Sequence, residues 1–459
     1  MVRKGSKKEK ELRHKARRLN IKEGILWTFG DSLGYNYISP FAIAVNASNS
    51  LVAMISSLVG LISPLGQIIG SNLMEKHSRK KIFLKTRFFS SLTWIPLIII
   101  AILFYKGIIV NLLPLAVLLF FSFYVALSSI LIPAWFSWAG DIVDKKYRGR
   151  WFAKRNLFTG IFTLILAVLA AVFLDYFKKQ GWIMFGFGIL FLLTFMTRFA
   201  TLKIIKKEYE PKIKIKKRDY FSFWNFLIKA PKTNFGRFAI FRLFLSMANM
   251  VSFSVLAIYL LRFLGFSYTS YTLIILSHLF FSLFFIRLWG VISDIYGNYK
   301  VLCITSMLIP IIPILLILNT SVLYLISTGV VRGFAWSGFS LSERNFVYDN
   351  VEKSKRGLAT SYYNMMGGIG IFLGAGIGAI LIRYLKTSFI EPIILIFIIG
   401  AIARMIVVFI GMTKIKEVRK TEKLRNLKDF EEIILKETKP SLVEEAHEIF
   451  SIKKYIHTR

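Results

Sequence analysis

The sequence repeats one feature twelve times: a run of about 20 mostly apolar residues, which is the length an α-helix needs to cross a bilayer. The composition agrees, because 55% of the residues are hydrophobic and the mean hydropathy is +0.58. An ordinary soluble core would not hide that much apolar surface. We therefore expect an all-α membrane protein with transmembrane helices at 24–46, 51–73, 88–106, 112–138, 156–175, 183–203, 238–261, 271–292, 299–318, 322–347, 358–382 and 391–413.

The charge pattern predicts how these helices are oriented. With a cytoplasmic N-terminus, about 49 of the 61 Lys and Arg residues fall on the cytoplasmic side, where they are typically enriched. Both termini of a multi-pass protein of the cell membrane should therefore be cytoplasmic. The net charge of +36 then belongs to a membrane face that attracts anionic lipid headgroups, and it gives no reason to expect nucleic acid as a partner.

Five parts follow along the chain. A basic cytoplasmic arm, 1–23, precedes a six-helix bundle, 24–203, and a cytoplasmic loop, 204–237, precedes a second bundle, 238–413. A charged cytoplasmic tail, 414–459, completes the chain. The first apolar run is long and contains Asp31, so we interpret it as a retained helix and not as a cleaved signal. In the loop, the aromatic stretch around Trp224 predicts a helix lying on the membrane surface.

The two bundles repeat one another in sequence. Asp141 and Asp349 each precede an Arg-Gly pair by seven residues, and Arg148 and Arg356 begin those pairs at the same offset of 208. Glu75 and Asp294 correspond at an offset of 219. Arg198 and Arg404 also correspond, at an offset of 206. This pattern predicts two pseudo-symmetric six-helix bundles.

In the second bundle, the loop after the second helix contains Gly290, Asp294 and Gly297, which are a glycine, an acidic residue four positions later and a further glycine. In this the chain resembles the major facilitator superfamily, over about residues 20–415. The resemblance implies that the acidic loop residues help to lock the two halves together on the cytoplasmic side, whereas the alternative is an ordinary solvated charge. The gating candidates on this basis are Glu75, Arg79, Asp141, Arg148, Asp294, Asp349 and Arg356. Drug–proton antiporters of the family carry an Arg in their fourth helix, which is absent here.

Charged residues inside a membrane are costly and usually functional. Arg332 lies in the middle of its helix and should face either a cavity or a buried acid. Asp31 could bind a proton or cation, or could pair with Arg242. The adjacent Glu343 and Arg344 point about 100° apart, so at least one should face the cavity or a neighbouring helix.

The remaining site candidates are uncharged or titrate near neutral pH. His278 could relay protons or could simply pack against a neighbour through a hydrogen bond. Aromatic and amide side chains of the inner helices could line a solute site or could pack helices together. These residues are Tyr35, Asn36, Trp135, Trp138, Asn249 and Trp336.

The functional expectation is a secondary active transporter that moves a small organic solute by alternating access, with proton-coupled symport as one option. A drug or lipid exporter is an alternative within transport, and a non-transporting receptor or scaffold is an alternative of another class. We expect a monomer without a cofactor. No enzyme motif is present, and the single cysteine, Cys303, excludes a cysteine-based metal site.

Overall fold

The structure is a computed structural model that describes residues 7–143, 148–211, 223–352 and 355–418, and in these residues the secondary structure is helical. The first half of the molecule contains α1 Lys7–Leu33, α2 Ile38–Ala44, α3 Asn49–Lys76, α4 Arg79–Leu92, α5 Trp94–Tyr105, α6 Leu113–Ile142, α7 Arg148–Lys179 and α8 Ile183–Lys207. The second half contains α10 Asn234–Phe253, α11 Leu256–Ile258, α12 Tyr268–Tyr296, α13 Asn298–Leu308, α14 Ile311–Leu318, α15 Val322–Asn350, α16 Arg356–Tyr384 and α17 Pro392–Lys414. The short α9 Phe223–Lys229 lies between the halves in the sequence.

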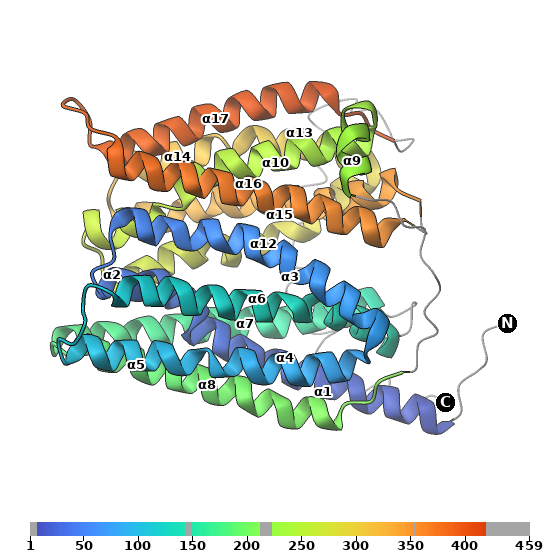
Figure 1. The fold of residues 1–459 in the computed structure, drawn as a ribbon. Helices are drawn as coiled ribbons and strands as arrows, with labels where there is room; N and C mark the ends of the chain where they lie inside the picture. Colours follow the sequence, from blue (N-terminus) through green and yellow to red (C-terminus); the bar gives the residue numbers. More distant parts are fainter. Residues whose placement is uncertain (1–6, 144–147, 212–222, 353–354, 419–459) are drawn as a thin grey trace.

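Figure 1 shows the two halves as two packed groups of roughly parallel helices. Within the described residues, 11 helical stretches are long and apolar enough to span a membrane. The first crossing, made of α1, a 3₁₀ turn at Tyr35–Tyr37 and α2, is the remaining one, because its N-terminal part is too charged to qualify. The expected fold of six plus six helices is therefore confirmed.

The helices extend further than the apolar runs predict. The first helix begins at Lys7 and not at residue 24, so most of the basic arm is helical, with an ion pair between Glu9 and Arg13 at 2.8 Å. The third crossing begins at Arg79, nine residues before its expected start at 88. A hydropathy pattern marks only the part of a helix that meets lipid. Lys, Glu and Arg are good helix formers, so the helices continue beyond that part.

Prolines explain two of the breaks within the crossings. Pro96 has no N–H to bond the carbonyl of Leu92, where α4 ends before α5 begins. In the same way Pro313 cannot bond Ile309, which lies between α13 and α14. These breaks bend the crossings without ending them.

The halves meet mainly through α3 against α16 and α7 against α12. Gly60 on α3 and Gly368 on α16 allow a close approach, because a Cβ on Gly368 would lie 2.5 Å from the Gly60 carbonyl oxygen. Near its C-terminal end, α3 packs against its own half, where Gly70 lies against Ile130 of α6. In Figure 1, α3 inclines away from α16 in this direction. We call the end where α1 begins the terminal end, and the opposite one the far end.

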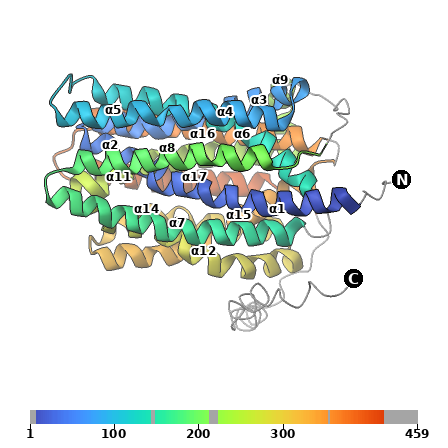
Figure 2. The same cartoon turned by 90° about the horizontal axis from the view of Figure 1, so that it is seen from below.

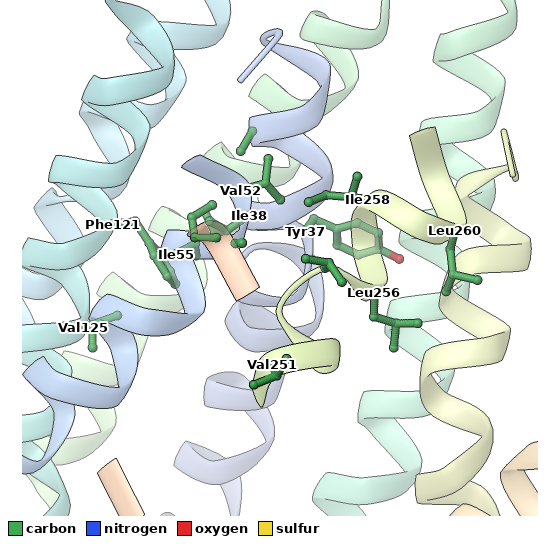
Figure 3. Close-up of a cluster of buried hydrophobic side chains, with 14 of the residues drawn as sticks. Tyr37, Ile38, Val52, Ile55, Phe121, Val125, Val251, Leu256, Ile258 and Leu260 are labelled. Atoms are coloured by element: carbon green, nitrogen blue, oxygen red, sulfur yellow. The ribbon is translucent and has the colours of Figure 1, made fainter. Parts of the chain in front are cut away.

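Figure 3 shows an apolar cluster that lies between the halves. Tyr37, Ile38 and Val52 of the first half contact the region of Leu256 and Ile258 in the second half, and all five side chains are buried. Because helices in a membrane associate mainly through close van der Waals packing, this cluster helps to hold the two halves together at that level of the molecule.

Candidate functional site

Hydrogen bonds cross between the halves at the far end. Asp175, near the end of α7, accepts hydrogen bonds from the backbone N–H groups of Tyr268 and Thr269, both at 2.8 Å. These N–H groups belong to the first residues of α12, which have no carbonyl partner within the helix. The carboxylate therefore caps the N-terminus of α12 and interacts favourably with the helix dipole. Nearby, the hydroxyl groups of Tyr37 and Thr272 are 3.0 Å apart.

Two further residues, Arg262 and Ser57, bond across the halves. Arg262 donates to the carbonyl oxygen of Ala47 at 2.9 Å and also bonds the side chain of Asn49. The hydroxyl of Ser57 donates to the carbonyl oxygen of Phe372 at 2.8 Å, one turn from the glycine contact of α3 with α16. Together with Asp175 and Tyr37, Arg262 holds the far end of the two halves together, whereas the bond of Ser57 lies nearer the middle of α16.

Asp31 forms an ion pair with Arg198 of α8. The guanidinium carbon of Arg198 lies 3.2 Å from the centre of the Trp27 ring, and one of its nitrogens donates to the Tyr124 hydroxyl at 2.9 Å. The expected pairing of Asp31 with Arg242 is wrong, because α1 packs directly against α7 and α8 whereas Arg242 belongs to the other half. Figure 2 shows α1 lying between these two helices. The Arg198 side chain is 1% exposed and that of Asp31 is 36% exposed.

A buried cluster of one carboxylate and two arginines in the first half was not found by the sequence analysis. Glu23 lies 3.0 Å from Arg87 and 3.7 Å from Arg155, and its side chain is only 3% exposed. Glu23 was assigned to the basic arm because the apolar run begins after it. Its spacing of four from Trp27 and eight from Asp31 could have indicated a shared face of α1.

In the second half, Arg242 of α10 lies 2.9 Å from Glu343 of α15. The hydroxyl of Tyr363 on α16 donates to the same carboxylate at 2.6 Å, so the cluster joins three helices. The Arg242 side chain is 26% exposed and that of Glu343 is 11% exposed. Arg344 is exposed and donates to the carbonyl oxygen of Ser340, one turn back, so of this adjacent pair it is Glu343 that faces a neighbouring helix.

Arg332 is buried, and among the described residues no carboxylate bonds it. One of its terminal nitrogens donates to the carbonyl oxygen of Ile274 at 2.6 Å and to the Ser277 hydroxyl at 2.8 Å, while its Nε has no partner. The expected buried acid is therefore not its partner. His278, next along α12, shares a hydrogen bond with the carbonyl oxygen of Ile275 at 2.6 Å, which agrees with a packing role.

The aromatic and amide candidates do not form one group. Tyr35 and Asn36 are exposed, and the Tyr35 ring packs against Phe121 and Tyr124. Trp138 is buried, and its N–H donates to the Tyr209 carbonyl oxygen at 3.0 Å, so it is a structural residue of the terminal end.

The other three members of that group lie on different helices. Trp135 of α6 is half-buried, with the Arg155 guanidinium 4.4 Å from its ring centre. Trp336 of α15 is also half-buried and packs on Phe339. The backbone carbonyl of Asn249 on α10 accepts a hydrogen bond at 2.8 Å from Arg404, a buried arginine of α17.

The gating candidates at the terminal end form matching contacts within each half. Arg79 lies 2.6 Å from Asp141 in the first half, and the Asn298 side chain donates to Asp349 at 2.7 Å in the second. Asp294 is exposed. The side chains of three candidates lie outside the described residues: Glu75, Arg148 and Arg356.

Comparisons with solved structures confirm the fold. The nucleoside transporter NupG is 16% identical to the chain with a TM-score of 0.61, and the match covers 88% of this chain and 98% of that one. A bacterial homologue of the iron transporter ferroportin in an inward-facing state is also 16% identical with a TM-score of 0.61, over 87% and 98%. A bacterial homologue of the human lysosomal transporter Spinster, inward-facing and unoccupied, is 12% identical with a TM-score of 0.58, over 89% and 97%.

No curated protein sequence matches the chain significantly. The sequence profile of the Major Facilitator Superfamily matches twice, at residues 25–248 and 238–454. The two matches correspond to the two halves of the fold and together cover nearly the whole chain. The chain therefore belongs to the Major Facilitator Superfamily and is a secondary transporter, not an enzyme.

Proposed function

We propose that this transporter carries a small organic solute through a site between its two halves, and that the structure represents the state open to the cytoplasm. The observation that supports this most strongly is the position of the bonds between the halves. Asp175, Arg262 and Tyr37 all make their contacts with the other half at the far end. A solute would then enter or leave from the terminal end.

The orientation in the membrane rests on the basic residues. They concentrate at the terminal end, so we place this end and both termini in the cytoplasm of a cell-membrane protein. The α9 helix supports the same placement. Its Trp224 and Ile228 are four residues apart and are 71% and 66% exposed, with Lys229 beside them. Such a helix suits the interface between acyl chains and anionic headgroups.

The solute site in this proposal lies between two partly exposed charged groups, Asp31 and Arg242. Asp31 presents a carboxylate from the first half, and Arg242 presents a guanidinium from the second, while the partner of each is more deeply buried. Tyr35, Asn36 and Trp336 supply further polar and aromatic surface. Asp31 and Glu343 are the carboxylates that we propose for proton coupling, because each already holds an arginine that would be released on protonation.

Gating at the terminal end remains part of the proposal. Arg79 with Asp141, and Asn298 with Asp349, tie adjacent helices within each half. Asp294 is exposed, and in this proposal its carboxylate contacts the other half when the terminal end closes. The monomer expected from the sequence stays a prediction.

The test is uptake into proteoliposomes. A panel of sugars, nucleosides, amino acids and organic acids is offered with and without an inward proton gradient, and empty liposomes serve as the control. Uptake of at least one solute class above the control supports the proposal. Flux that is absent for the whole panel under both conditions contradicts it, and so does channel-like flux that does not saturate.

A further inference from the structure

The buried arginines of the two halves are neutralised unequally. In the first half, Glu23 forms ion pairs with Arg87 and Arg155, and Asp31 forms an ion pair with Arg198. In the second half, Arg242, Arg332 and Arg404 lie well inside the membrane crossings, and of the described carboxylates only that of Glu343 bonds one of them, Arg242. The other two, Arg332 and Arg404, are each held by one carbonyl oxygen and one serine hydroxyl.

Carbonyl and hydroxyl oxygens satisfy N–H groups, but they do not neutralise a positive charge. A buried ion without a counter-ion is costly in a medium of low dielectric constant. Arg332 is 5% exposed and its Nε has no hydrogen-bond partner. The second half therefore carries a positive charge that a bound anion would stabilise.

The position of Arg332 on α15 distinguishes it from Arg404. Trp336 and Glu343 follow Arg332 by four and eleven residues, which places all three within about 40° on one face of the helix. Glu343 of this face contacts α10, and α10 carries Arg242 of the proposed solute site. Arg404 instead lies on α17 and ties that helix to Asn249 and Ser252 of α10.

We propose that the transported solute is an organic anion, whose carboxylate or phosphate group binds Arg332 while its carbon skeleton packs on Trp336. This inference rests on the proposed transport function and adds the substrate class. The Ile274 carbonyl and the Ser277 hydroxyl hold one terminal nitrogen of the guanidinium in place, so the group is oriented before the solute arrives. The Trp336 ring lies one helical turn away, about 6 Å along the axis, which suits a small molecule.

The test compares solutes that differ in charge alone. Purified transporter is mixed with benzoate or benzamide, with succinate or succinamide, and with inorganic phosphate, and the melting temperature and the uptake into proteoliposomes are measured. The inference predicts that a carboxylate raises the melting temperature and is taken up, while its amide does neither, since binding stabilises the folded state. Stabilisation by phosphate alone, without uptake of any organic acid, would identify an adventitious anion site and would overturn the inference.

Arg332→Gln and Arg332→Lys are compared with Arg404→Gln as the matched control. Arg404→Gln removes an equally buried arginine with the same kinds of partner. Arg332→Gln should weaken binding of the carboxylate by about 30-fold or more, and Arg332→Lys should restore part of it. Arg404→Gln should lower the melting temperature without a change in the preference of acid over amide.

The outcomes separate the two proposals. Uptake of neutral or cationic solutes in place of acids would overturn the anion assignment and leave the transport function intact. Equal acid affinity in Arg332→Gln and wild type would also overturn it. If Arg332→Gln does not fold, the acid-to-amide preference of Arg332→Lys and of the wild type decides. The absence of saturable uptake for solutes of every charge would refute transport itself.

Discussion

Asp31 of α1 and Arg198 of α8 form an ion pair in the first half, with the arginine fully buried and the carboxylate about one-third exposed. The corresponding arginine of the second half, Arg404, bonds a backbone carbonyl of α10 in place of a carboxylate. The two halves therefore share a fold but differ in charge at equivalent positions. The proposed solute site would therefore have a carboxylate on one side and arginines on the other.

Asp31→Asn should destabilise the protein, because it leaves Arg198 buried without a counter-ion. Since Asp31 is partly exposed, we expect a loss of about 1–3 kcal/mol in the free energy of unfolding. Thermal unfolding in detergent measures this as a lower melting temperature. Asp294→Asn, which changes an exposed aspartate, is the control and should melt like the wild type. Equal melting of Asp31→Asn and the control would show that the ion pair contributes no stability.

Tyr363→Phe should also destabilise, because the hydroxyl donates to the ionised Glu343 carboxylate at 2.6 Å. Loss of a hydrogen bond to a charged group costs about 1.5–3 kcal/mol. Tyr384→Phe, at a tyrosine that is 66% exposed, provides the matched control. If both variants melt at the wild-type temperature, Tyr363 does not stabilise the Arg242–Glu343 pair.

Glu208, just beyond α8, should make stability depend on pH. Burial raises the pKa of its carboxyl from 4.5 to about 8, against the lowering effect of the hydrogen bond from Asn20. Between these two values the folded protein binds more protons than the unfolded chain. The free energy of unfolding should therefore fall as pH rises from about 4.5 to 8.

Glu208→Gln should remove that part of the pH dependence, because an amide does not titrate. The melting temperatures of wild type and variant are compared from pH 5 to pH 8 (about the range of the transition). Glu352→Gln, at a side chain that is 74% exposed, controls for the loss of one carboxylate. Parallel curves for wild type and Glu208→Gln would argue against a protonated Glu208 in the folded state.

A spin label at position 224 should report the membrane interface. The label is attached to Trp224→Cys in a Cys303→Ser background, since Cys303 is the one cysteine of the chain. A label near the headgroups is accessible to lipid-soluble oxygen as well as to water-soluble relaxation agents. Lys232→Cys, in the turn after α9, serves as the comparison. Accessibility to water-soluble agents alone at position 224 would mean that α9 lies away from the membrane.

The helical fold and its repeat were predictable from the sequence, because apolar runs and shared offsets are properties of the chain itself. The partner of Asp31 was not, since a charge pattern does not say which neighbouring helix an inward side chain meets. Glu23 was missed because it precedes the apolar run, although it lies on the same helix. Arg332 was expected to face a cavity or a buried acid, and the carbonyl and hydroxyl groups that it bonds instead depend on how α12 packs against α15.

The most direct test of alternating access is a cross-link across the far end. Asp175→Cys and Thr269→Cys, in the Cys303→Ser background, replace a contact of 2.8 Å between the halves. The control, Asn234→Cys with Asn350→Cys, replaces a contact of 2.8 Å within the second half. Oxidation should abolish solute uptake by the first variant, reduction should restore it, and the control should transport in both states. Unchanged uptake with the far end cross-linked would contradict the account.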